Sequence, residues 1–358
     1  MKGEVVYLYA FDVAYEIVTS KVQEILAQKP FPFTIRTEHT FPRDVPLYQP
    51  LAVEPPFHSR IGDRPVSLLI RVYSLGVVTV AFRVSFEIET LLDLFPFHRA
   101  TLDKGQTLDE AAREICAGVC KSLREFMVRS AQPSAPEAYS IFCLTELSGV
   151  QDVNHWLRQN RRTAAGLLSE TNPDRISENQ VRESLRIRRS FEKTDVVVID
   201  WDAALVVDLD GYVEDVLYVL ELANLQLEEF RVMDRSLDRY LDQFYDRLER
   251  LPSPFLGWSA GVLRALRRFR VDLTKLADEV THITKFFGDW YLARIYLGAR
   301  GRFYLDHWRQ SVEQRLVQVD QLYTVVQSEI YEKRMFWLEL IIVFLFVVDV
   351  LALFFWKR

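Results

Sequence analysis

The sequence predicts an α+β protein in which an N-terminal ferredoxin-like (βαββαβ) domain precedes long helices and one C-terminal transmembrane helix. Segments rich in Val, Tyr and Phe alternate with helical ones over the first 150 residues, apolar residues fall at heptad spacing after residue 212, and the run Met335–Trp356 is mostly apolar. The predicted parts are listed in chain order: 1–150, an α+β domain; 151–211, a basic linker and an acidic β-hairpin; 212–334, an antiparallel long-helix, coiled-coil-like domain; 335–356, the anchor.

The first part is predicted to run in the order β-α-β-β-α-β. Thr107 begins the second of its helices with Glu110 three residues on, which is the capping-box spacing. The order is that of the split βαβ unit, in which two helices cover one face of a four-stranded antiparallel sheet, and that fold by itself predicts no function. The ranges are 4–12, 66–73, 77–86 and 138–147 for the strands, 14–28 and 107–129 for the helices, and 29–65 for a proline-rich irregular connection.

The segment 151–193 is polar and basic, and it has two interpretations. It is a solvated helical linker, or it is a surface for phosphate groups of an anionic lipid or of RNA. In the second case Arg186, Arg188 and Arg189 are the candidate binding residues.

An acidic hairpin follows, in which two short apolar runs are bordered by Asp200 and Asp202 at one place and by Asp208 and Asp210 at the other. Period two puts the members of each pair on one face of a strand. Four carboxylates are a candidate Mg²⁺ site for phosphoryl transfer. The other interpretation is that acids gather at strand ends and helix starts without any catalytic role.

The helical part contains two stripes at coiled-coil spacing. The first, Leu227 to Leu251, is interrupted only by Asp234, and the second, Leu305 to Ile330, continues into the anchor without a helix breaker. The basic segment 264–285 is expected to lie antiparallel to the acidic first helix. These stripes predict a homo-oligomer.

The anchor has 22 residues, which span about 33 Å as a helix and match the hydrocarbon thickness of a bilayer. A buried core helix or an amphipathic surface helix is the weaker interpretation, because apolar residues cover every face. Glu339 lies near the entry interface. Asp349 lies deeper, so we expect that it is shifted toward the far interface, carries a proton, or contacts a polar group of a neighbouring helix. Glu339 and Asp349 are therefore the predicted membrane or oligomer contacts.

Composition limits the location and the chemistry. A net charge of −6 argues against a protein that coats nucleic acid. The three cysteines, Cys116, Cys120 and Cys143, do not make a disulfide framework, which is typical of a reducing compartment, and small buried hydrophobes are favoured over a metal site. With no N-terminal targeting pattern, the prediction is a single-pass protein with its body on the cytoplasmic side, in a bacterial inner membrane.

Four stretches carry a resemblance to a known family: the α/β N-terminal part, the acidic entry VIDWDAALVVDLDGY, the segment GDWYLARIYLGARGRFYLDHW and the terminal FWLELIIVFLFVVDVL. Together they resemble the required-for-meiotic-nuclear-division family of C-terminally membrane-anchored proteins. The resemblance implies a membrane-anchored scaffold, and in mitochondrial members a link with translation at the inner membrane. It implies no catalytic residues.

The sequence therefore predicts a scaffold that self-associates through its C-terminal helices and presents the α+β domain to a protein partner. It predicts no enzyme and no cofactor. The alternatives are a metal-dependent phosphoryl-transfer enzyme and a membrane-proximal protein that binds RNA or the ribosome.

Overall fold

A computed structural model describes residues 1–19, 31–32, 50–130, 135–209, 211–249, 267, 271 and 290–356. The chain divides into two compact units, Met1–Val232 with Thr281–Trp308, and Met233–Val280 with Arg309–Arg358. The first unit combines residues from three of the predicted parts, so it does not follow the predicted boundaries at 150 and 211.

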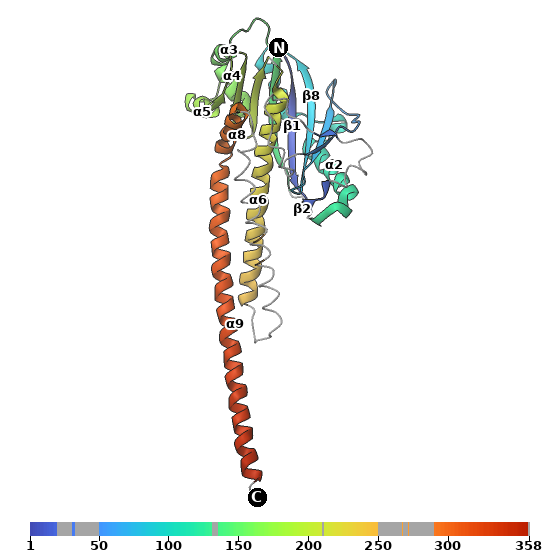
Figure 1. Ribbon diagram of the computed structural model, residues 1–358. Coiled ribbons are helices and arrows are strands. Elements are labelled where there is room, and N and C mark those ends of the chain that lie inside the picture. Colours follow the sequence, from blue (N-terminus) through green and yellow to red (C-terminus); the bar gives the residue numbers. More distant parts are fainter. Residues whose placement is uncertain are drawn as a thin grey trace. The chain divides into compact units, whose positions relative to one another are not determined.

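The first unit is built on a nine-stranded sheet with the order β11-β12-β13-β10-β1-β8-β7-β4-β3 (Figure 1). Neighbouring strands are antiparallel except β10 and β13, which run parallel. Its strands are β1 Lys2–Asp12, β3 Phe31–Pro32, β4 Leu51–Val53, β7 Ser67–Val72, β8 Val77–Glu87, β10 Glu137–Glu146, β11 Ile187–Arg189, β12 Asp195–Ile199 and β13 Ala203–Asp208. Two small sheets pair β2 Ala14–Ile17 with β9 Met127–Ser130, and β5 Arg60–Ile61 with β6 Arg64–Pro65.

Helices cover both faces of this sheet, so the first unit has three layers. The described helices are α2 Leu108–Leu123, α3 Val153–Gln159, α4 Arg161–Leu168, α5 Glu178–Ser184, α6 Val213–Glu249, α8 Trp290–Arg302 and α9 Leu305–Trp356, with 3-10 turns at η2 Leu91–Arg99, η3 Asp103–Gly105 and η4 Arg124–Phe126. On one face, α2, α3, α4 and η2 pack with alternate strand residues such as Val5 and Phe82. On the other face, α6 lies over Leu8, Leu69 and Ala81, and α8 packs on β11 and β12.

The sequence accounts for several of these elements. Thr107 caps α2 by accepting a hydrogen bond from the Glu110 amide, while the Glu110 carboxylate accepts from the Thr107 amide. Gly76 closes the β7–β8 hairpin with φ +95°, and its carbonyl accepts hydrogen bonds from Val13 and Ala14. A side chain at position 76 would begin 1.8 Å from the Ala14 carbonyl oxygen, so only glycine fits this turn.

The four predicted N-terminal strands are present as β1, β7, β8 and β10 and lie adjacent in the order β10-β1-β8-β7. The four-stranded ferredoxin-like domain itself is not confirmed, because β11–β13 extend the sheet at one edge and β3 and β4 at the other. The helix predicted over 14–28 is wrong at its start, where β2 pairs with β9, and residues 20–28 lie outside the described part. The helix predicted over 107–129 ends at Leu123.

The segment predicted as a solvated linker is part of the folded unit. α4 buries Ala164, Leu167 and Leu168 in the main core, and α3 adds Val153 and Leu157. The acidic hairpin is present as β12 and β13. The basic helix predicted over 264–285 lies outside the described residues, apart from the single helical positions 267 and 271.

In the second unit, the C-terminal part of α6 lies beside α9. Leu237 of α6 and Val312 and Val319 of α9, all predicted stripe positions, are buried. Asp234, the polar residue that interrupts the first stripe, lies 3.3 Å from Arg315 of α9, which also pairs with Asp238. The polar interruption is therefore matched by an opposite charge.

Candidate functional site

The acids of the hairpin do not gather into one site. Asp200 and Asp202 lie in the turn between β12 and β13, whereas Asp208 ends β13 at the opposite end of the hairpin, across from Asp195. Asp210 lies outside the described residues. Within the described part of the chain, no three His, Cys, Asp or Glu side chains form a group that could hold a metal ion.

Asp200 and Asp208 are instead engaged by separate groups of the protein. Asp200 is buried, pairs with Arg302 at the end of α8 and accepts a hydrogen bond from the Trp201 amide at 2.8 Å. Asp208 accepts hydrogen bonds from the amides of Gly211 and Tyr212, at 3.0 and 3.2 Å, just before α6 begins. An acid in this position stabilises a helix N-terminus, so the role of Asp208 is structural.

The hairpin acids also attach α8 to the sheet. Asp195 accepts a hydrogen bond from the Tyr291 hydroxyl near the start of α8. At the end of α8, Arg302 joins Asp200 to Glu183 of α5, with 2.6 Å between Arg302 Nη1 and Glu183 Oε1. Asp200, one of the carboxylates predicted as metal ligands, therefore holds α8 in place together with Asp195.

Asp202 differs from Asp200 because no arginine among the described residues pairs with it directly. Partial burial, followed by the negative charges of Glu170 and Asp200, raises the pKa of its carboxyl above the usual range.

The three candidate arginines lie on and beside β11, the last strand at its edge of the sheet. Arg188 is exposed, Arg186 is exposed and lies 3.4 Å from Glu183, and Arg189 is half-buried under α8, where its Nε donates to the carbonyl of Arg294 at 3.4 Å. The three do not form one phosphate cradle, because Arg189 and Arg186 are engaged by the protein itself.

The outward face of α8 continues this edge and was not predicted as a site. Trp290 and Leu297 are 66% and 49% exposed, and Arg294, between them at helical spacing, lies over the Trp290 ring at 4.6 Å. Beyond the helix, Tyr304 and Trp201 are also exposed, and their rings lie 5.6 Å apart at a tilt of 55°. We call Trp290, Arg294, Leu297, Tyr304 and Trp201 the α8 surface.

The opposite face of α8 explains why these side chains are displayed. Ile295, Tyr296 and Ala299 are fully buried, and the Tyr296 hydroxyl donates to Gln226 of α6. At Gly298 a Cβ would lie 3.0 Å from Ile187 of β11, so glycine allows close packing. The signal in the sequence was the spacing of Trp290, Arg294 and Leu297, which places all three on one face of a helix.

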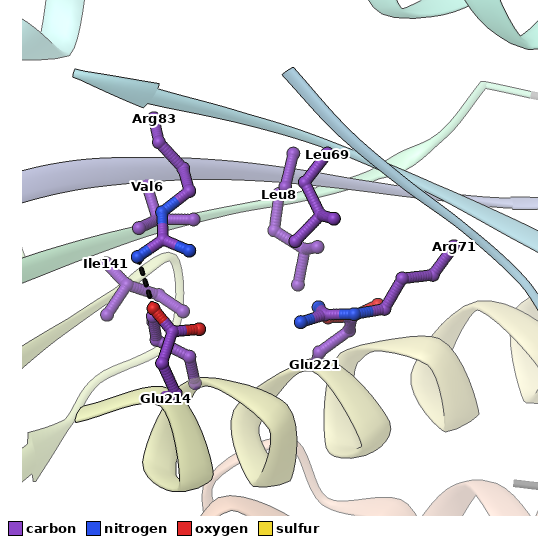
Figure 2. A pocket seen from close by; sticks show the side chains of 10 residues that line it. Val6, Leu8, Leu69, Arg71, Arg83, Ile141, Glu214 and Glu221 are labelled. Carbon is purple, nitrogen blue, oxygen red and sulfur yellow. Dashed lines mark hydrogen bonds and ion pairs between the residues drawn. The ribbon is translucent and has the colours of Figure 1, made fainter. Parts of the chain in front are cut away.

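A buried charge cluster lies between α6 and the sheet (Figure 2). Glu221 of α6 pairs with Arg71 of β7 and accepts hydrogen bonds from Tyr73, at 2.9 Å, and Thr79. Burial works to lower the pKa of Arg71, but the carboxylate of Glu221 together with Tyr73, Glu214 and Tyr218 outweighs it, and the pKa is raised. Burial also raises the pKa of Tyr73 well above its usual range, so its hydroxyl remains a donor.

Glu214 lies two turns nearer the start of α6 and pairs with Arg83. Arg83 also binds Glu4, with 3.0 Å between Arg83 Nε and Glu4 Oε2. The space that the two clusters enclose has a volume of about 10 Å³. That volume holds about one water molecule, so the clusters fasten α6 to the sheet and leave no room for a substrate.

The helix α9 carries the remaining candidate. Within it, the 18 residues Met335–Ala352 are long and apolar enough to cross a membrane, and none is buried. Glu339 and Asp349 are both exposed on this segment.

The fold and these surfaces define an α+β protein that displays an aromatic and basic surface on α8 and has a C-terminal helix able to span a membrane. The chain belongs to the family described as "Uncharacterized protein MJ0711, N-terminal domain", whose model matches residues 2–213, from β1 to the first residue of α6. The protein is similar to "Uncharacterized protein MJ0711" of Methanocaldococcus jannaschii, with 21% identity over 273 residues that cover 76% of this chain and 77% of the relative. No solved structure matches the chain.

Neither comparison concerns the required-for-meiotic-nuclear-division family, so that resemblance stays a prediction. The relative is archaeal, and the assignment to a bacterial membrane likewise stays a prediction.

Proposed function

We propose that this protein is a membrane-anchored scaffold: α9 holds it in the bilayer, the body faces the cytoplasm, and the α8 surface binds an acidic segment of a protein partner. The observation that carries the proposal is the apolar segment Met335–Ala352, which buries none of its side chains in the protein. In water this segment would expose many large apolar side chains side by side, whereas a bilayer accommodates them.

The composition of the α8 surface supports a protein partner. Trp, Tyr and Arg are the residues that most often dominate the binding energy of protein interfaces. Arg294 already lies over Trp290, and exposed Arg188 lies on the neighbouring strand β11. A partner that inserts an apolar side chain beside Leu297 and places a carboxylate near Arg294 matches both features, which is why we specify an acidic segment.

Self-association through the C-terminal helices is part of the proposal. The pairing of Arg315 with Asp234 and Asp238 takes place within one chain and matches the charge that interrupts the first stripe. Asp349 is exposed within the apolar segment and is therefore the proposed contact between neighbouring anchors.

The two alternatives lose support from the geometry. A phosphoryl-transfer site needs converging carboxylates, and Asp200 and Asp208 lie at opposite ends of a hairpin. An RNA or ribosome site on Arg186, Arg188 and Arg189 would have to recruit side chains that Glu183 and the Arg294 carbonyl engage.

The anchor is tested with the full-length protein and the double variant Ile342→Arg/Leu345→Arg. Each charge costs about 2.5–3.5 kcal/mol at the centre of a membrane helix, so the variant should be extracted from membranes by alkaline carbonate while the wild type stays in the pellet. A protease added to inverted vesicles should digest the body of the wild type. Extraction of the wild type by carbonate would refute the anchor, and protection of the body would refute the orientation.

The α8 surface is tested by placing a photoreactive amino acid at Leu297 in cells. Leu92 is the matched control, because it is a leucine of similar exposure, 54%, in η2 on the other face of the sheet. We expect a crosslinked protein at position 297 that is lost with Arg294→Glu and absent at position 92. Equal crosslinking at both positions, nuclease-sensitive products, or products that persist with Arg294→Glu would each contradict a specific acidic protein partner.

A further inference from the structure

A pair of thiols on α2 has no role in the proposed scaffold. Cys116 and Cys120 are one helical turn apart, and their sulfur atoms lie 4.0 Å from each other. Cys116 is fully buried against the main core, whereas Cys120 is half-buried and reaches the surface. One sulfur is therefore accessible, and the other lies directly behind it.

The third cysteine cannot join them. Cys143 is fully buried on β10, and its neighbour Phe142 is the one that points into the core shared with α2. Successive residues of a strand point to opposite faces, so Cys143 points away from α2, toward the side of Glu4 and Arg83. The site has two sulfur ligands.

The separation of the two sulfurs suits one metal ion between them. At a metal–sulfur distance of about 2.3 Å, two sulfurs stand roughly 3.8 Å apart in tetrahedral geometry and roughly 4.6 Å apart on a line. The observed 4.0 Å is about 0.6 Å short of the linear separation that a two-coordinate ion prefers, and rotation of the half-exposed Cys120 side chain can supply that difference without movement of the backbone. Ligands four residues apart on a helix are also the spacing by which HExxH helices hold zinc.

From this geometry we propose that Cys116 and Cys120 form a binding site for a thiophilic monovalent metal ion, with Cu⁺ as the preferred occupant. Thiolates select soft ions such as Cu⁺ and also bind Zn²⁺. Structural Zn²⁺ requires four ligands, however, and among the described residues no third His, Cys, Asp or Glu lies close enough to complete a metal site. Cu⁺ is satisfied by two sulfurs.

Binding exchanges protons for the metal ion: Cu⁺ and two thiols give a bis-thiolate complex with one negative charge and two released protons. Cys120 reaches the surface, whereas Cys116 is fully buried behind it, so Cys120 is the first ligand and Cys116 loses its proton when the ion is already bound.

The test uses the full-length protein in detergent, loaded anaerobically with Cu⁺ and titrated with a Cu⁺-specific chelator. We expect one Cu⁺ per chain, two sulfur neighbours in X-ray absorption, and affinity for Cu⁺ at least 100-fold lower in Cys120→Ser. Cys143→Ala is the matched control and should bind as the wild type does. Because Cys120 is half-exposed, Cys120→Ser should keep the fold, which circular dichroism verifies.

Three results would overturn the site. They are wild-type protein that retains no Cu⁺ against the chelator, Cys120→Ser that binds as tightly as the wild type, and Zn²⁺ that displaces Cu⁺ at equal concentration. None of them bears on the membrane anchor or the α8 surface, so the two proposals fail independently.

Discussion

Replacement of Glu221 by leucine should destabilise the first unit more than any other single change at the sheet-facing side of α6. Glu221 is 2% exposed and is the carboxylate against which the charge of Arg71 is balanced, with Tyr73 and Thr79 donating to it as well. Removal of one partner of a buried ion pair costs about 3–5 kcal/mol. For a unit of this size, each kcal/mol lowers Tm by roughly 2–4 °C, so we expect a loss of roughly 6–20 °C.

The matched control is Glu214→Leu on the same helix. Glu214 also pairs with an arginine of the sheet, Arg83, but its side chain is 50% exposed. An exposed pair contributes about 0–1 kcal/mol, so this variant should lose no more than roughly 4 °C. The measurement is thermal unfolding of the full-length protein in detergent, followed by tryptophan fluorescence.

The double variant Arg71→Met/Glu221→Leu separates charge balance from packing. When both charges are replaced by apolar side chains of similar volume, the desolvation penalty is removed from both partners, and stability should recover most of the loss. The reasoning is refuted if Glu221→Leu unfolds within about 2 °C of the wild type, or if the double variant is as unstable as the two single losses added together.

Three further predictions concern stability. Burial lowers the pKa of His98 despite the carboxylate of Glu170 at 3.3 Å, so the unfolded chain takes up a proton first and stability falls as pH drops below about 6.5. The variant His98→Gln should flatten the dependence of Tm on pH between 7.5 and 5.0. An unchanged slope would contradict this prediction. Gly76→Ala should cost at least about 1–3 kcal/mol by denaturant unfolding, because its Cβ would overlap the Ala14 carbonyl and φ is positive, and a neutral result would refute the turn geometry. Arg302→Met should release the end of α8 and leave Asp200 without its arginine, which should lower the free energy of unfolding by about 3–5 kcal/mol. Amide hydrogen exchange should become faster in residues 290–302, and uniform exchange along the chain would contradict this prediction.

The sequence predicted the central strands because their patterns are local. β8 and β10 lie within one residue of the predicted ranges, and the capping box at Thr107 begins α2 as expected. The same reasoning missed the strands β4 and β11, because each is only three residues long and leaves no periodic pattern to read.

One available signal was overlooked. The run Val5–Phe11 is apolar at every position, and a strand of that kind is buried on both faces. A ferredoxin-like sheet with one open face would have called for alternation. The apolar run of β1 therefore predicts that helices cover both faces of the sheet, but it does not predict that α6 and α8 are the helices on the second face.

The candidate acids were misread for a different reason. Period two places neighbouring acids on one face of a strand, but only the hairpin register shows that Asp200 and Asp208 lie at opposite ends. The partner of Asp200, Arg302, is 102 residues away in sequence, whereas Asp208 accepts hydrogen bonds from the nearby amides of Gly211 and Tyr212. No local pattern reports a partner as distant as Arg302. Likewise, the close packing of Gly298 on Ile187 shows which side of α8 faces the sheet, and that packing is not encoded in the residues around Trp290, Arg294 and Leu297.

The division of the first unit into Met1–Val232 and Thr281–Trp308 sets the order of events during synthesis. Ribosomes add about 5–20 residues each second, so the 57 residues from 233 to 289 delay the start of α8 by roughly 3–11 s. During that interval the sheet edge at β11 and β12 waits uncovered, with Asp195 and Asp200 lacking Tyr291 and Arg302. The nascent chain therefore reaches its last helix with the sheet only just closed, and a chaperone that shields this edge would act within those seconds.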